Sequence, residues 1–203
     1  MTKPPWRLIP HETLEGFSTL AFDASLLKGN FPFPILRFYS WSRPCISYGY
    51  FQTPPEATSF PAYRRVTGGG IVFHDKDLTY SLTYPRASAP TWSVRRSYLE
   101  IQAVVQRALI TLGVEAVQCR DDAPGYFCFE HPVIGDLLYR GKKIAGAAQR
   151  RMGSRLLHQG TILIEPLGID RLACVDAIVE EFKKTYQVTC VPLWEKESLL
   201  LKT

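Results

Sequence analysis

The sequence lacks the cysteine arrangements that hold small secreted domains together or bind zinc. Its cysteines are five, an odd number, and no two of them have Cys-x-x-Cys spacing. Neither a disulfide framework nor a metal site is therefore expected. We expect reduced thiols, and for Cys45, Cys119, Cys174 and Cys190 the ordinary role of small core residues.

Long apolar runs are also missing. No stretch approaches the roughly 20 residues that a membrane-spanning helix needs. The opening residues, MTKPPWR, lack the apolar segment of a secretory signal. These absences predict a cytoplasmic protein without a membrane partner.

No internal repeat, low-complexity tract or linker divides the chain. Its 203 residues are enough for one well-cored domain and few for two. Strand-like and helix-like segments are interspersed without a regular βαβ rhythm, which favours an α+β fold with a largely antiparallel or mixed sheet flanked by helices. We expect a single domain over 1–203.

Positive charge exceeds negative charge, and the net value is +5. A surplus of this size is common in soluble proteins, but it also speeds association with an acidic partner. Nucleic acid and an acidic carrier protein are the two candidates, and the motifs described below favour the carrier protein over nucleic acid.

Hydrophobic periodicity locates the expected elements. Apolar residues at three- and four-residue spacing predict helices over 13–28, from a capping box at Ser97 to Gly113, and around 172–182. Runs of β-branched and aromatic residues predict strands. These strands are 35–41, 45–50, 64–67, 71–73, 78–84, 114–119, 136–139, 143–150 and 156–164.

A first cluster that could carry chemistry is RRVTGGGIVFHD, over 64–75. Three glycines between strands fit a wide turn with positive φ angles, and equally a bare backbone surface against which a ligand lies. It is not a Walker loop, because no Lys-Ser/Thr follows. Neighbouring strand residues point to opposite faces, so only one of Arg64 and Arg65 can readily enter a pocket. A histidine at a strand end, such as His74, is more often structural than catalytic.

A second cluster contains Cys128 and Lys143. Cys128 lies in a predicted loop between two phenylalanines, a poor place for a core residue and a suitable one for a reactive thiol. Lys143 precedes IAGAA, whose side chains are small enough for a ligand to lie across the strand. Hairpin lysines are usually solvated, but an ammonium here could stabilise a developing oxyanion. A thiol and a nearby ammonium suffice for acyl transfer through a thioester.

Three motifs, in this order, resemble the lipoate-attachment branch of the biotin/lipoate protein ligase superfamily. They are RRVTGGGIVFHD at 64–75, GKKIAGAAQR at 141–150 and HQGT at 158–161. LRFYSW at 36–41 and SYGYFQ at 47–52 are similar to the family's early strands. The resemblance covers roughly residues 13 to 165 and implies the α+β catalytic-domain fold of that superfamily.

The resemblance also implies roles for individual residues. Lys143 takes the place of the family's indispensable lysine, and Lys142 takes the variable basic position beside it. Acyl-binding positions carry over from all three motifs, and these are Arg65, Thr67, Gly68, Gly69, Gly70, His74, Gly146, Ala147, His158 and Gly160.

Two branches of the family remain open. CFEHP at 128–132, followed by Asp136, resembles octanoyltransferases of the LipM type, whose nucleophile stands where Cys128 does. ATP-dependent lipoate ligases have an Asn-Asp near Asp136 and no cysteine upstream, and here Gly135 replaces that Asn. Gly70, in contrast, gives the Gly-Gly-Gly form of the ligases. We expect no C-terminal accessory domain of the kind that classical ligases carry.

The favoured hypothesis is a transferase of protein lipoylation that needs no cofactor. It passes an octanoyl or lipoyl group from acyl carrier protein through Cys128 to a lysine on a lipoyl domain, of a 2-oxoacid dehydrogenase or of the glycine-cleavage H protein. The alternative is an ATP-dependent lipoate–protein ligase that forms a lipoyl-adenylate with ATP and magnesium. A third hypothesis is a non-catalytic protein that binds lipoyl domains. Biotin attachment is disfavoured, because the Gly-Arg-Gly-Arg loop of biotin enzymes is absent.

Overall fold

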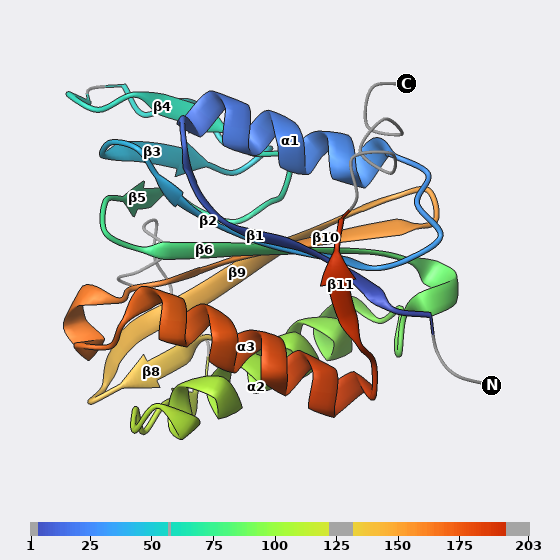
Figure 1. Cartoon of the computed structure of the whole chain (residues 1–203). Helices are drawn as coiled ribbons and strands as arrows, with labels where there is room; N and C mark the ends of the chain where they lie inside the picture. The colour runs from blue at the N-terminus through green and yellow to red at the C-terminus, as the bar shows by residue number, and fades with distance from the viewer. Residues whose placement is uncertain (1–3, 57, 122–131, 194–203) are drawn as a thin grey trace.

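The computed structural model describes residues 4–56, 58–121 and 132–193. Within these residues a mixed sheet of eight strands runs through the centre of the molecule (Figure 1). In sheet order the strands are β11 (Cys190–Pro192), β1 (Trp6–Leu14), β2 (Ile35–Trp41), β6 (Leu78–Pro85), β10 (Arg155–Ile162), β9 (Lys142–Met152), β8 (Leu137–Tyr139) and β7 (Val117–Gln118). The pairs β11–β1 and β1–β2 are parallel and the other pairs antiparallel. The predicted α+β class with a mixed sheet is confirmed.

Helix α1 (Gly16–Lys28) and a small sheet cover one face of the main sheet (Figure 1). The small sheet has the order β4 (Ala62–Arg64), β3 (Cys45–Tyr48) and β5 (Val72–His74). β3 pairs in parallel with β4 and antiparallel with β5. The glycine-rich segment connects β4 to β5, so this small sheet carries it over the face of the main sheet.

Helices α2 (Val94–Thr111) and α3 (Arg171–Tyr186) cover the opposite face (Figure 1). The largest core cluster forms between them and the sheet, because every third or fourth helical residue is apolar and faces inward. Leu36, Leu82, Val104 and Ile178 are fully buried members of this cluster. Short 3-10 turns precede α2 and α3, at Arg86–Ser88 and Glu165–Leu167. None of the described helices combines the length and the apolar character of a membrane span.

A buried polar cluster attaches α1 to the sheet. The Asp23 carboxylate accepts hydrogen bonds from Arg37 at 2.8 Å, Tyr39 at 2.9 Å, Ser81 at 2.8 Å and Gln159 at 2.7 Å. A buried charge is tolerated only when it is paired and fully hydrogen-bonded, as this one is. The cluster therefore fixes α1 above β2, β6 and β10, beside the cavity described below.

Several predicted boundaries are wrong for identifiable reasons. The predicted start of the first helix at residue 13 is too early, because the chain up to Leu14 pairs with β2 as part of β1. α2 begins one turn before the predicted cap: Ser93 accepts from the Arg96 N–H, whereas the Ser97 hydroxyl donates to the Val94 carbonyl inside the helix. β4 ends at Arg64, where the predicted strand began. Strands β1 and β11 were not predicted, and the strand expected over 114–119 is reduced to β7.

Candidate active site

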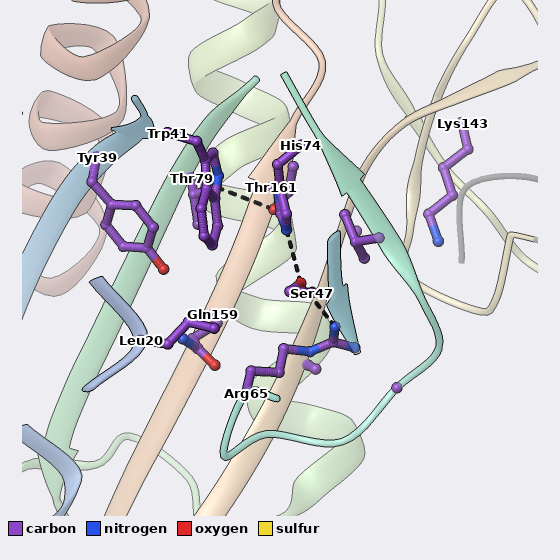
Figure 2. A pocket seen from close by; sticks show the side chains of 15 residues that line it. Leu20, Tyr39, Trp41, Ser47, Arg65, His74, Thr79, Lys143, Gln159 and Thr161 are labelled. Atoms are coloured by element: carbon purple, nitrogen blue, oxygen red, sulfur yellow. Dashed lines mark hydrogen bonds between the residues drawn. The ribbon is translucent and has the colours of Figure 1, made fainter. Parts of the chain in front are cut away.

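A cavity of about 50 Å3 lies between the small sheet and the strands β9 and β10 (Figure 2). Leu20, Tyr39 and Trp41 form its apolar end, and in the view of Figure 2 Lys143 lies across the cavity from Leu20 and Tyr39. The wall between them comes from the small sheet and β10. The cavity therefore has an apolar end and a charged end.

Lys143 supplies the charge at one end. Its Nζ lies 2.6 Å from Asp136 Oδ2, and the two side chains are only 5% and 1% exposed. The Asp136 carboxylate accepts two further hydrogen bonds, from the Tyr98 hydroxyl to Oδ1 at 2.6 Å and from the Val133 N–H to Oδ2 at 2.8 Å. The Tyr98 hydroxyl in turn accepts from the Ala147 N–H at 3.1 Å. Burial, reinforced by the Asp136 carboxylate, holds the pKa of Tyr98 well above its ordinary value, so the phenol keeps its proton. An ammonium is thus fixed at the cavity wall.

Gly146 makes room for this ammonium. A Cβ at residue 146 would stand 2.7 Å from Lys143 Cε and 3.0 Å from Asp136 Oδ1. Gly146 and Ala147 both line the cavity. The small residues after Lys143 therefore allow its side chain to lie along its own strand.

The glycine turn is held by Arg65. Its Nε and Nη2 donate to the Gly68 carbonyl at 3.1 and 2.8 Å, and Nη2 also donates to the Gly70 carbonyl at 2.6 Å. Gly69, between them, has a φ of 84° and lines the cavity. Arg65 is buried whereas Arg64 is exposed, so one of the two arginines enters the site, as the sequence predicted.

Thr67 connects the glycine turn to the main sheet. Its hydroxyl is buried and donates to Gln159 Oε1 at 2.7 Å, and Gln159 Nε2 donates in turn to Asp23. Gln159 lines the cavity from β10. The turn is therefore linked by side chains to both α1 and the sheet.

His74 is buried in the wall of the cavity. Its Nδ1 lies 2.8 Å from Asp77 Oδ2 and its Nε2 lies 2.8 Å from Ser47 Oγ. The Trp41 ring stacks on the imidazole with centroids 4.0 Å apart. Burial by itself would raise the pKa of Asp77, but the adjacent His74 and the hydrogen bonds from His74 and Thr79 outweigh it and lower that pKa.

His158 and Gly160 do not reach the cavity. Side chains alternate along β10, so these two positions face α2 while Gln159 and Thr161 face the cavity. His158 is fully buried, with Nε2 3.2 Å from the Tyr80 hydroxyl, and a side chain at Gly160 would overlap the Tyr80 ring. Burial, with a smaller effect of Arg151, lowers the pKa of His158 to about 3. His158 and Gly160, which the resemblance assigned to the acyl-binding positions, therefore lie outside the lining of this cavity.

Cys128 lies outside the described residues. Of the other cysteines, Cys45 and Cys174 are fully buried core residues, and burial raises the pKa of each thiol to about 12. Cys119 and Cys190 are half-buried. The part of the chain that the structure describes contains no cluster of His, Cys, Asp and Glu able to hold a metal ion.

A second, more open hollow of about 460 Å3 adjoins the cavity. The two share Gly69, Ala147 and Ala148, and the hollow extends along α2 past Tyr98 and Leu99. The glycine turn and β9 therefore form a rim common to both spaces.

Comparison with known proteins identifies the family. Residues 15–190 match the model of the lipoyl protein ligase A/B catalytic domain. The octanoyltransferase LipM of Carboxydothermus hydrogenoformans is 36% identical over 82% of the chain and 67% of its own length. That of Oceanobacillus iheyensis is 33% identical over 77% of the chain and 63% of its own length. The chain belongs to the lipoyl protein ligase A/B catalytic domain family. It spans about two thirds of the length of these two relatives.

Solved structures agree with this family at the level of the fold. A lipoate-protein ligase A bound with ATP superimposes with a TM-score of 0.77 at 22% identity, over 98% of this chain and 93% of its own. A bipartite lipoate protein ligase from Thermoplasma acidophilum gives 0.74 at 20% identity, over 100% and 91%. At such identities the likeness establishes the fold alone.

Several residues at the cavity were not predicted as members of the site, among them Asp77, Asp136, Ser47 and Tyr98, which bond to the predicted residues. Asp77 follows His74 by three residues, a spacing that could have indicated a partner for the imidazole. In the sequence, Asp136 was used only as a position of the family motif that follows Cys128, and no role was assigned to it. Ser47 and Tyr98 gave no signal, because strand pairing and the packing of α2 bring them to the site from distant parts of the sequence.

Proposed function

We propose that this protein is an octanoyltransferase of protein lipoylation. The observation that carries the proposal is the 36% identity to an octanoyltransferase LipM over 82% of the chain. The cavity supports it, since it has an apolar end for an acyl chain and a buried ammonium at the other.

In the first step the Cys128 thiolate attacks the carbonyl carbon of an octanoyl thioester on acyl carrier protein. A bond from carbon to the Cys128 sulfur forms, the bond to the carrier's sulfur breaks, and the departing thiolate takes up the proton that Cys128 lost. The product is an octanoyl-enzyme thioester.

In the second step a lysine amine of a lipoyl domain attacks the same carbon. The carbon–nitrogen bond forms, the bond to Cys128 breaks, and the proton lost by the amine ends on the Cys128 sulfur. Conversion of a thioester to an amide is downhill, so the reaction needs neither ATP nor another cofactor.

Lys143 stabilises the oxyanion that forms in both steps. A preorganised charge in a water-poor site is effective because it does not need to reorient during the reaction. Asp136, 2.6 Å away, holds the Lys143 ammonium in position, and Tyr98 and the Val133 N–H hold Asp136 in turn. Breaking such a buried pair would leave an uncompensated charge.

A cavity of about 50 Å3 is too small for an eight-carbon chain, so the apolar end formed by Leu20, Tyr39 and Trp41 has to open when the acyl chain enters beyond Lys143. Each buried methylene contributes about 0.8 kcal/mol, which is enough for the cavity to discriminate against short acyl groups.

An ATP-dependent ligase is the second candidate, because Gly70 gives the loop its ligase form. In that reaction ATP activates a free carboxylate and Cys128 takes no part. The two candidates differ in what they require, so one experiment separates them.

The test is the intact mass of the protein after incubation with octanoyl–acyl carrier protein, without ATP. We expect a gain of one octanoyl group that hydroxylamine removes and that Cys128→Ala abolishes, with Cys119→Ala as the matched control. Acylation that persists in Cys128→Ala, or that needs free octanoate and ATP, would contradict the transferase.

A further inference from the structure

Four buried side chains form a hydrogen-bonded chain at the cavity wall, and of these Figure 2 shows Arg65, Ser47 and His74. Asp77 Oδ2 lies 2.8 Å from His74 Nδ1, His74 Nε2 lies 2.8 Å from Ser47 Oγ, and Arg65 Nη1 donates to Ser47 Oγ at 3.1 Å. Each of the four residues is no more than 6% exposed. The small sheet assembles them, since Ser47 is on β3, His74 is on β5 and Arg65 directly follows β4.

The chemistry of the groups fixes the direction of the two outer hydrogen bonds. An ionised carboxylate can only accept, so His74 Nδ1 carries a proton and donates to Asp77. The Ser47 oxygen accepts from Arg65, because a guanidinium has no acceptor. The hydrogen bond of 2.8 Å between His74 Nε2 and Ser47 Oγ joins these two, so a continuous chain runs from Arg65 through Ser47 and His74 to Asp77.

The other side of the same guanidinium holds the glycine turn. Arg65 donates to the Gly68 carbonyl through two nitrogens and to the Gly70 carbonyl at 2.6 Å. Gly69 lies between these two carbonyls and faces the cavity. The position of Gly69 against a ligand thus depends on how Arg65 is oriented.

Serine, histidine and aspartate in this order also form the nucleophilic triads of hydrolases. Two observations favour a different role here. The Ser47 oxygen already accepts a hydrogen bond from a cation, which lowers its nucleophilicity. The His74 imidazole is bonded at both nitrogens and stacked on Trp41, which holds the ring in place.

We infer that Asp77, His74 and Ser47 are positioning residues that act through Arg65 to hold the glycine turn in the shape that receives the acyl group. The identity of that ligand rests on the proposed octanoyltransferase function. The coupling between the buried chain and the turn does not depend on that function and can be measured separately.

The test compares Ser47→Ala and His74→Phe with Thr83→Val. Phenylalanine preserves a ring against Trp41 but removes both nitrogens. Thr83 is a matched control, because it carries a buried hydroxyl on β6 that has no partner among the described residues. Amide hydrogen exchange of a peptide covering residues 67–71 is measured by mass spectrometry, with a peptide from β10 as internal reference.

We expect exchange in the glycine turn to accelerate about 10-fold or more in Ser47→Ala and His74→Phe, since each loses a hydrogen bond in a chain that ends on a charged group. The β10 peptide and the Thr83→Val protein should remain as in the wild type. The value of kcat/KM for octanoyl transfer should fall between about 10- and 100-fold in the same two variants, the range expected when a ligand is misplaced. Ser47→Thr, which keeps the hydroxyl, should restore both readouts.

Three results would overturn the inference. Unchanged exchange in the turn would show that the chain does not hold it, and equal acceleration in β10 would show a general loss of stability. Reaction of Ser47 with a fluorophosphonate probe would identify it as a nucleophile instead. If the wild type transfers no octanoyl group while the exchange responds as expected, the proposed function fails and the positioning role stands.

Discussion

Lys143 and Asp136 form a buried ion pair at the cavity wall, with 2.6 Å between Nζ and Oδ2. Desolvation makes such a pair costly unless the remaining lone pairs are also bonded, and here Tyr98 and Val133 bond to the carboxylate. The pair is therefore better explained by a need for a fixed ammonium than by a need for stability.

Removing that ammonium should abolish most of the activity. We expect Lys143→Ala to lower the rate of octanoyl transfer on the order of 100- to 1000-fold, the usual effect of losing one preorganised donor. Lys143→Arg should not restore it, because a broad guanidinium cannot replace a compact ammonium above Gly146. The neighbouring Lys142 is exposed and supplies the control: Lys142→Ala should transfer the octanoyl group at the rate of the wild type. Equal activity of the Lys142 and Lys143 variants would refute the catalytic assignment and favour a binding protein.

His158 should make stability depend on pH. Its pKa is about 3 in the folded protein and about 6.5 when unfolded, so between these values the unfolded chain binds a proton that the folded chain does not. The free energy of unfolding therefore decreases as pH falls through this window, by about 2 kcal/mol between pH 7 and pH 5. Urea unfolding of the wild type at both pH values should show this decrease. The control is His158→Gln, whose side chain does not titrate, and its free energy of unfolding should decrease less over the same pH range. Identical losses in the two proteins would rule out His158 as the source.

The glycine turn depends on a close approach between two backbone segments. Tyr50 donates its N–H to the Thr67 carbonyl at 2.9 Å, and a methyl group at Gly49 would overlap the Gly69 carbonyl oxygen. A carbonyl within a turn cannot move aside as a flexible side chain can. The strand end after β3 and the turn therefore have to adapt to each other.

This contact can be tested by comparing two glycines. Gly49→Ala should lower the free energy of unfolding by about 1–3 kcal/mol, a typical cost of overpacking. At Gly68 an added Cβ meets no atom within 4 Å, so Gly68→Ala should leave the free energy of unfolding nearly unchanged. Denaturant unfolding of both variants measures the difference. Equal free energies of unfolding would show that the turn can shift to accommodate the added methyl group at little cost.

Local sequence patterns were sufficient to predict some elements and not others. The helix around 172–182 was expected and is α3, because its apolar spacing directly creates the face that packs on the sheet. The cap of α2 was misplaced, because Ser93 and Ser97 both fit a cap and only the packed helix distinguishes them. β11 is a short strand of three residues that exists through its pairing with β1, which no local pattern reveals.

For the whole molecule, the net charge of +5 should accelerate the encounter with an acidic carrier or acceptor. Screening shortens the reach of this attraction to a Debye length of about 8 Å at physiological ionic strength. We therefore expect kcat/KM for octanoyl transfer from acyl carrier protein to fall as salt rises, while kcat changes little. A small neutral octanoyl thioester is the control donor, since it should show no such dependence. A flat salt profile with the carrier protein would show that the positive charge does not steer it.

The α+β class and the family follow from the sequence alone. Lys143, Arg65 and the three glycines stand in contiguous motifs whose order is readable without a structure. The tertiary structure shows which groups hold these residues: Asp136 pairs with Lys143, and Ser47, backed by His74 and Asp77, bonds to Arg65. It also turned His158 away from the cavity, because the face of a strand residue depends on register. Such pairings depend on sheet order and on the packing of α1 and α2, which bring together residues far apart in the chain.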